Sequence, residues 1–101
     1  MKLGIEGFHK AFESRIRLGI MSALVVNEKL SFNELKEYLD LTDGNLASHV
    51  KALEKDGFID VNKTFVGRKP LTSYFITKEG TAAFNTHLKA LENLIKLQND
   101  K

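Results

Sequence analysis

Residues 42–57, Thr-Asp-Gly-Asn-Leu-Ala-Ser-His-Val-Lys-Ala-Leu-Glu-Lys-Asp-Gly, form the stretch on which the fold of this chain depends. Thr42 or Asp43 can cap the start of a helix with a side-chain oxygen, and Gly57 suits the left-handed conformation just past its end. At about 100° per residue, this helix carries a narrow apolar stripe on one face. The stripe consists of Leu46, Val50 and Leu53.

The opposite face of this helix is polar and short-chained, and no acid interrupts it. Its residues are Gly44, Asn45, Ser48, Lys51, Ala52 and Lys55. Most exposed helix faces mix long lysine and glutamate side chains, whereas this composition lets the backbone approach another surface closely. The segment alone is equally compatible with an ordinary solvated face, and the residues that follow it favour a binding surface.

Composition places the chain among small single-domain proteins. It has 101 residues, 43% of them hydrophobic, a net charge of +2 and no cysteine. The charge permits a polyanionic partner without requiring one, and the lack of cysteine excludes disulfides and thiolate metal sites. No apolar run approaches the roughly 20 residues of a membrane span, and we find no secretion signal. We therefore expect one cytoplasmic domain over residues 1–101, without a membrane partner.

Two helices are predicted before residues 42–57. The first runs from about residue 8 to 26, with an apolar stripe made by Phe12, Ile16, Ile20 and Leu24. A bridging strand at Lys29-Leu30 separates it from residues 31–34, Ser-Phe-Asn-Glu, which form a capping box. The helix that the box opens ends near Asp40. The short connection to the next helix predicts a helix-turn-helix crossing.

After Gly57 the spacing of the apolar residues changes from the helical period of about 3.6 residues towards a period of two. Ile59, Val61 and Phe65 alternate with polar residues and predict a half-buried strand, and a second strand follows over residues 71–77. A hairpin loop over about residues 66–70 joins them. A final helix is predicted over about residues 78–97, with a core stripe of Phe84, Leu88, Leu91 and Ile95. This order of elements predicts a winged helix-turn-helix, a mainly α fold with a small β-hairpin (α+β).

Four segments of the chain resemble the ArsR/MarR class of winged-helix transcriptional regulators. Residues 48–59 are similar to the S-x-H-L-x-x-L-x-x-x-G-L-V stretch of that class, with the histidine directly after the serine here. Residues 14–21 look like its R-x-x-I-L segment, and residues 67–80 like G-R-x-P-x-T-x-Y-x-L-T-x-x-G. With residues 43–46, the set is closest to the small stand-alone regulators of this class. The chain departs from the pattern in having two cations at the hairpin tip and no arginine on the third helix.

The resemblance implies double-stranded DNA as partner, with the third helix, about residues 43–56, in the major groove. Asn45 and Ser48 can present short polar groups to base edges there. Gly44 leaves room for close approach, and its amide can meet a phosphate. The predicted helix contacts are Gly44, Asn45, Ser48, His49, Lys51 and Lys55, with the lysines on phosphates. Taken alone, His49 at the flank of the apolar stripe also fits a half-buried core histidine.

The hairpin is expected to act as the wing, which reaches along the DNA backbone or into the minor groove. Arg68 and Lys69 are its predicted DNA contacts, since a guanidinium on a narrow hairpin suits an A·T-rich minor groove. The alternative for these two cations is a solubilised turn.

Other function classes find less support in the residues. We find no phosphate loop, nucleophile elbow or zinc-binding helix, so we predict neither an enzyme nor a cofactor. His9, His49 and His87 are isolated in sequence, and a His9–His87 interface site is the only route to metal sensing. The main alternative is a winged helix that docks a protein within a transcription assembly. The wing cations favour DNA over this alternative.

The apolar residues of the first and last helices exceed what one small core needs, which predicts a homodimer built on these helices. The predicted interface residues are Phe8, Phe12, Leu88, Leu91, Leu94, Ile95 and Leu97. A two-fold dimer would place its recognition helices about 34 Å apart and imply a pseudo-palindromic site. Without an activation domain, such a regulator most simply represses by occluding polymerase. The operator and the regulated genes stay open, and a small-molecule effector is neither indicated nor excluded.

Overall fold

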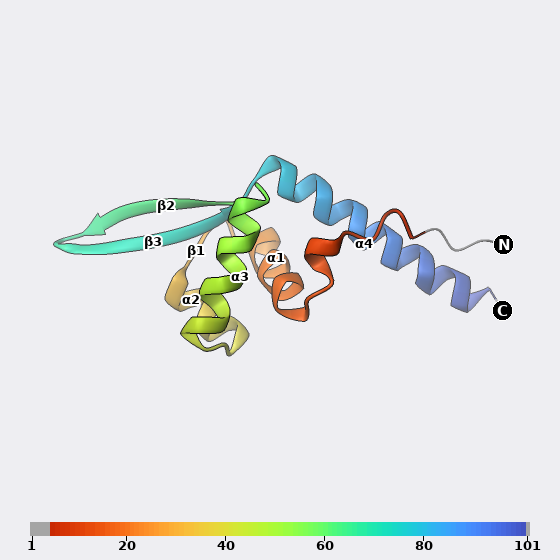
Figure 1. Cartoon of the computed structure of the whole chain (residues 1–101), viewed down its shortest axis with the longest axis horizontal. Helices are drawn as coiled ribbons and strands as arrows, with labels where there is room; N and C mark the ends of the chain where they lie inside the picture. Colours follow the sequence, from red (N-terminus) through yellow and green to blue (C-terminus); the bar gives the residue numbers. More distant parts are fainter. Residues whose placement is uncertain (1–4, 101) are drawn as a thin grey trace.

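The computed structural model describes residues 5–100 and has an elongated outline of 59 × 25 × 21 Å. A hairpin and the last helix project from opposite ends of a small group of helices (Figure 1). In chain order the elements are η1 (Lys10–Phe12), α1 (Arg15–Val26), β1 (Leu30–Ser31), α2 (Phe32–Leu39), α3 (Asp43–Lys55), β2 (Ile59–Val66), β3 (Lys69–Ile76) and α4 (Lys78–Asn99). The winged-helix order predicted from the sequence is confirmed.

The N-terminal region differs from the single helix predicted over about residues 8–26. A 3-10 turn, η1, comes first, and α1 begins only after Ser14. His9 Nδ1 accepts a hydrogen bond from the amide of Ala11 at 3.0 Å, and Ser14 Oγ accepts one from the amide of Arg17 at 3.4 Å. These side chains cap local turns and so compete with a continuous helix. Despite this break in the helix, Phe12 lies in the core with the apolar residues of α1 and is only 2% exposed.

Local caps set the starts of both helices of the helix-turn-helix. The first cap is the predicted capping box, and the second decides between the two predicted alternatives, Thr42 and Asp43. Ser31 and Glu34 form the capping box, with hydrogen bonds of 2.9 and 3.1 Å. Thr42 Oγ1 accepts from the amide of Asn45 at 3.3 Å and opens α3. Asp40 ends α2 in the left-handed region at φ 53°, which turns the chain into the short connection before α3.

A three-stranded antiparallel sheet in the order β1-β3-β2 lies beside the helices. Tyr74 of β3 faces Leu30 of β1 on one side and Val61 of β2 on the other. The β2–β3 pairing runs out to Val66 and Lys69, so the connecting turn is only Gly67-Arg68, shorter than the predicted loop of residues 66–70. Gly67 adopts φ 66°, which glycine tolerates readily.

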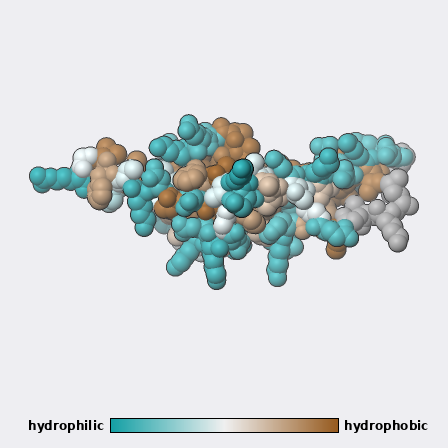
Figure 2. All heavy atoms as spheres, turned by 90° about the horizontal axis from the view of Figure 1, so that it is seen from above, coloured by the Kyte–Doolittle hydropathy of each residue, from teal (hydrophilic) through white to brown (hydrophobic). Residues whose placement is uncertain are grey.

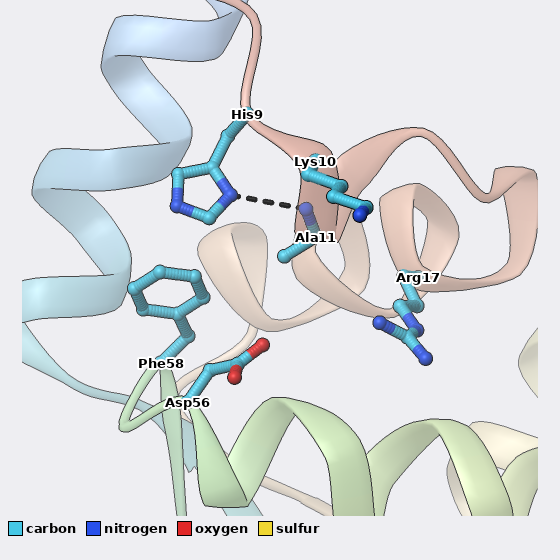
Figure 3. A pocket seen from close by; sticks show the side chains of 6 residues that line it. All are labelled: His9, Lys10, Ala11, Arg17, Asp56 and Phe58. Carbon is cyan, nitrogen blue, oxygen red and sulfur yellow. Dashed lines mark hydrogen bonds between the residues drawn. The ribbon is translucent and has the colours of Figure 1, made fainter.

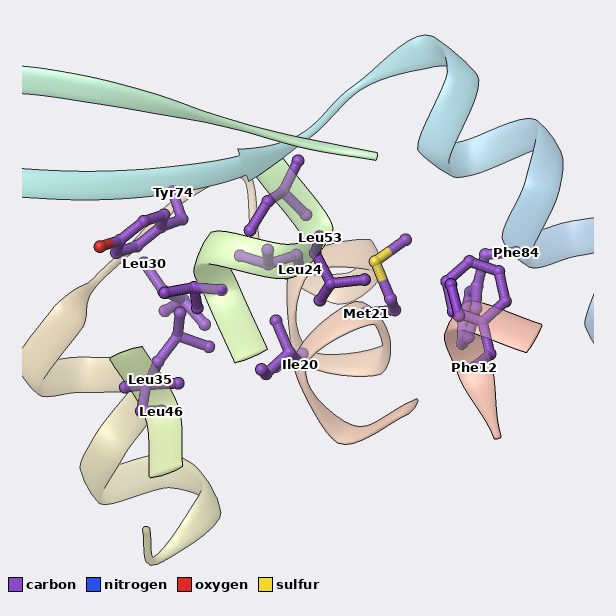
Figure 4. Packing of buried hydrophobic residues seen from close by; sticks show 14 residues of the cluster. Phe12, Ile20, Met21, Leu24, Leu30, Leu35, Leu46, Leu53, Tyr74 and Phe84 are labelled. Atoms are coloured by element: carbon purple, nitrogen blue, oxygen red, sulfur yellow. The ribbon is translucent and has the colours of Figure 1, made fainter. Parts of the chain in front are cut away.

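The core lies between the helices and the base of the hairpin (Figure 4). Its fully buried side chains include Ile20, Met21, Leu24, Leu35, Leu46, Leu53, Ile59 and Phe84. Only the base of the hairpin is half-buried. The alternation predicts that Phe65 shares the buried face of the strand, but it is 74% exposed because β2 extends past the last helix that could cover it.

The last helix contributes less to this core than its apolar stripe predicts. Phe84 and His87 are buried, whereas Leu88 and Ile95 are 41% and 57% exposed. The predicted core stripe of four residues is therefore wrong beyond Phe84. The reason is visible in Figure 1: α4 leaves the helical group after its first turns and continues towards the end of the chain.

Candidate nucleic-acid interface

The polar face of α3 is exposed as the sequence predicted. Gly44, Asn45, Ser48, Lys51 and Lys55 are all exposed, while the apolar stripe on the other face is buried. A Cβ built on Gly44 would find no atom within 4 Å, so the space directly beside this part of the backbone is open. The helix thus presents an amide and a hydroxyl side chain near its N-terminal half and two lysines towards its C-terminal half.

His49 is half-buried at the flank of this face and is engaged by a residue from another helix. Arg17 of α1 donates a hydrogen bond from Nε to His49 Nδ1 at 3.0 Å. Burial, and secondly the charge of Arg17, lower the pKa of His49 below its ordinary value of 6.5. The neutral ring accepts at Nδ1 and therefore carries its proton on Nε2.

Arg17 is a candidate interface residue that the sequence analysis missed. It places a guanidinium beside α3, which by itself carries no arginine. No local pattern distinguishes Arg17 from Arg15, since both occupy the first turn of α1. Only the packing of α1 against α3 makes the difference.

An acid at the start of α3 is paired with a residue of the neighbouring helix. Lys36 of α2 forms an ion pair with Asp43 at 2.9 Å, and the aspartate side chain is largely exposed. An exposed ion pair of this kind adds little stability. It does reduce the negative charge near Gly44 and Asn45, where a phosphate would have to approach.

The wing carries the two predicted cations at its end. Arg68 occupies the turn and Lys69 opens β3, and both are exposed. Figure 1 shows that the turn projects well beyond the helices, and Figure 2 shows hydrophilic side chains at the extremity of the molecule on that side. The two predicted contact groups thus lie on separate elements, the polar face of α3 and the tip of the hairpin.

The contacts of His9 and His87 do not support a metal site between them. The His9 amide donates to His87 Nδ1 at 3.0 Å, and His9 Nδ1 is occupied by the Ala11 amide. Over residues 5–100, no three histidine or acidic side chains cluster as a metal site would require. The histidines instead pack edge-on against Phe12 and Phe58.

A hollow of about 500 Å³ lies beside this histidine pair, between the N-terminal turn and the C-terminal end of α3 (Figure 3). Its lining consists of His9, Lys10, Ala11, Arg17, Asp56 and Phe58. The hollow is open to solvent on one side, and its polar groups are of both charges. It therefore has no single chemistry that would select a ligand.

Comparison with known proteins places the chain in a family. Residues 16–95 match the family model described as a winged helix DNA-binding domain. The chain belongs to this winged-helix family. It is 39% identical, over 87 residues, to an uncharacterized protein of Methanocaldococcus jannaschii, a match that covers 86% of this chain and 95% of the relative.

Two solved structures share the fold of this chain, one of them at an identity that also supports the family. A transcriptional regulator homologue from Pyrococcus horikoshii superposes with a TM-score of 0.80 at 35% identity, over 85% of each chain. PadR of Bacillus subtilis, solved in complex with operator DNA, superposes with a TM-score of 0.67 over 74% of this chain and 48% of PadR. At 20% identity that second likeness shows the fold alone.

Family membership confirms the resemblance to winged-helix regulators and the predicted fold. The chain is a winged-helix protein of the DNA-binding transcriptional regulator type, and not an enzyme. Among the helices described, none is both long enough and apolar enough to cross a membrane.

Proposed function

We propose that this winged-helix protein is a sequence-specific regulator that binds double-stranded DNA as a homodimer, with α3 in the major groove and the wing on the backbone or minor groove. The observation that carries the proposal is the polar face of α3. Apart from its two lysines it carries only short side chains, it contains no acid, and all of its residues except the half-buried Ala52 are exposed, opposite a buried stripe. Such a face suits a helix whose backbone comes close to base edges.

Each exposed residue of this face then has a role that its chemistry allows. Asn45 and Ser48 contact base edges, and Gly44 permits the close approach. Lys51 and Lys55 contact phosphates, which position the helix without reading sequence. His49 presents its Nε2–H beside them, held in place by Arg17.

The wing supplies the second contact. Arg68 and Lys69 lie at the end of a hairpin whose eight residue pairs carry them away from the helices. Cations at this position suit the phosphate backbone or a narrow minor groove.

The dimer interface is proposed on the outer part of α4. Leu88 and Ile95 are exposed there, and Leu91, Leu94 and Leu97 are only partly covered, as is Phe8 before η1. Phe12 is removed from the predicted interface, because it packs against Phe84 inside the protomer, with ring centroids 5.3 Å apart. An apolar helix face projecting from a small domain usually marks a contact with another protein. A dimer bound across an operator would repress by occlusion.

The test begins with selection of bound duplexes from a random pool, followed by mobility-shift assays of the selected duplex over a series of salt concentrations. We expect one selected sequence, bound with an affinity that falls steeply as salt rises. The rival function is a winged-helix module that docks a protein within a transcription assembly. Failure to bind any duplex, at low salt as well as high, would favour that rival.

The dimer has an independent test by analytical ultracentrifugation at micromolar concentration. We expect twice the mass of the chain for the natural protein and a monomer for Leu88→Asp combined with Ile95→Asp. Lys89→Asp is the matched control, since it changes the charge of the chain by the same two units at an exposed position of α4 whose neighbours one turn away are all polar. A natural protein that sediments as a monomer would contradict the dimer.

A further inference from the structure

The outer half of the wing carries exposed apolar side chains that the fold does not use. Phe65 and Val66 at the end of β2 are 74% and 65% exposed, and Leu71 on β3 is exposed as well. The hydrophobic core ends at the base of the hairpin, where Val61 and Tyr74 face each other. An aromatic ring on an unsupported hairpin end favours association with other molecules, so its presence there calls for a partner.

Strand alternation arranges these side chains around the tip. Phe65 faces Pro70 across the hairpin, and this pair shares its face with Val61 and Tyr74 at the base. Val66 and Leu71 occupy the other face, which makes the tip apolar on both sides. Pro70 has no amide to donate and a fixed φ, so it backs the Phe65 ring with a rigid surface.

Charge identifies the kind of partner. The hairpin of residues 59–76 contains three cations, Lys63, Arg68 and Lys69, and one acid, Asp60, which lies at its base. The apolar tip is therefore surrounded by positive charge, and Figure 2 shows hydrophobic spheres directly behind the hydrophilic extremity. This combination suits the minor groove of a nucleic acid duplex, whose walls are phosphates and whose floor is the edge of stacked bases.

We propose that the wing inserts Phe65, backed by Pro70, as an apolar wedge into the minor groove, where it partly unstacks one base step and bends the duplex. Apolar side chains that enter the minor groove act in this way, and the bend increases the contact with protein. The step that yields most easily is a pyrimidine–purine step, so the wedge also contributes to sequence preference without a base-specific hydrogen bond. The inference rests on the proposed DNA-binding function and adds a deformation of the DNA to it.

The experiment uses the full chain and its selected duplex, with 2-aminopurine at each step of the region protected by the wing. Phe65→Ala is compared with Phe65→Leu, which keeps an apolar wedge, and with Arg68→Ala, which removes the charge at the turn. Each variant changes an exposed residue, and circular dichroism checks the fold. Bend angle is measured by circular permutation of the binding site, and affinity is measured over a series of salt concentrations.

We expect the natural protein to raise 2-aminopurine fluorescence at one step and to bend the duplex. Phe65→Ala abolishes both signals and binds about tenfold more weakly at an unchanged salt slope. Phe65→Leu keeps part of the bend. Arg68→Ala keeps the bend and reduces the salt slope by about one.

Two results would overturn the wedge while leaving the proposed function intact: a straight, fully stacked duplex in the complex, or an unchanged bend with Phe65→Ala. A lower sedimenting mass for Phe65→Ala would assign the tip to protein contact instead. If the natural protein binds no duplex, both proposals fail together, and this outcome is distinct from the others.

Discussion

Arg17 of α1 donates a hydrogen bond from Nε to Nδ1 of His49 on α3, over 3.0 Å and across 32 residues of sequence. The bond ties α3 to α1 and requires the imidazole to accept, so it exists only while Nδ1 of His49 carries no proton. Arg17→Ala removes both the donor and the nearby positive charge. We expect the pKa of His49 to rise in this variant, as followed by NMR titration of the ring proton.

Arg15→Ala is the control for this titration, since Arg15 is exposed in the same turn of α1 and is not bonded to His49. An unchanged pKa of His49 in Arg17→Ala would show that burial alone lowers it.

Alanine substitution of Asn45, Ser48 and His49 should each lower affinity for the selected duplex by about 1–3 kcal/mol. The reason is that each substitution removes a hydrogen-bonding group from the polar face of α3 or its flank, near the N-terminal half of the helix. Asn93→Ala on α4 controls for the removal of a polar side chain elsewhere. Three folded variants with natural affinity in mobility-shift titrations would exclude this face from the DNA contact.

Replacing Arg68 and Lys69 together with glutamine should reduce the slope of log affinity against log salt by about one for each phosphate that the wing no longer neutralises. Discrimination between related duplexes should change less than in the helix variants, because phosphates carry no base identity. The measurement is the salt series with the selected duplex. The wing cations would be excluded from the interface by a slope equal to that of the natural protein.

Gly80→Ala should destabilise the fold by about 1–3 kcal/mol, since its new Cβ would fall on the carbonyl oxygen of Phe58. That carbonyl also accepts the Thr77 amide at 3.0 Å, so the start of α4 docks closely on the Phe58 backbone. Gly44→Ala is the matched control. It has open space around the new methyl and should leave stability unchanged or raise it by up to about 1 kcal/mol. Equal urea midpoints for the two variants would refute the close approach.

Stability should fall at acidic pH through His87. Burial, and secondly the charge of His9, lower its pKa from 6.5, while Glu13 acts in the opposite direction. Below 6.5 the unfolded chain binds a proton that the folded chain excludes, so the free energy of unfolding decreases as the pH falls towards the folded-state pKa. Above 6.5 both states are neutral and this contribution is constant.

His87→Asn keeps an acceptor for the His9 amide but cannot be protonated, so its stability should decrease less on acidification in urea unfolding. His49, whose pKa is lowered too, retains part of the effect in this variant. The same pH dependence in the variant and the natural protein would assign the acid sensitivity to other groups.

The elements that sequence alone determined are those set by neighbours a few residues apart. The structure opens three helices through caps that span three residues, at Ser31 with Glu34, at Thr42 and at Thr77. The capping box of Ser31 and Glu34 was predicted as it stands, whereas the sequence left Thr42 and Asp43 as alternatives for α3. The stripe of Leu46, Val50 and Leu53 likewise predicted which face of α3 is buried and which is exposed. The role of that exposed face in binding DNA stays a prediction.

Only the tertiary structure decided which other element, if any, packs against each apolar or polar face. Periodicity shows that one side of α4 is apolar, but not that the core ends after His87 and leaves Leu88 uncovered. The apolar pattern also assigned Phe12 to a dimer surface, whereas the structure buries this side chain against Phe84. Arg17 gains its place beside His49 only because α1 and α3 pack together, a contact between distant residues that no local pattern encodes.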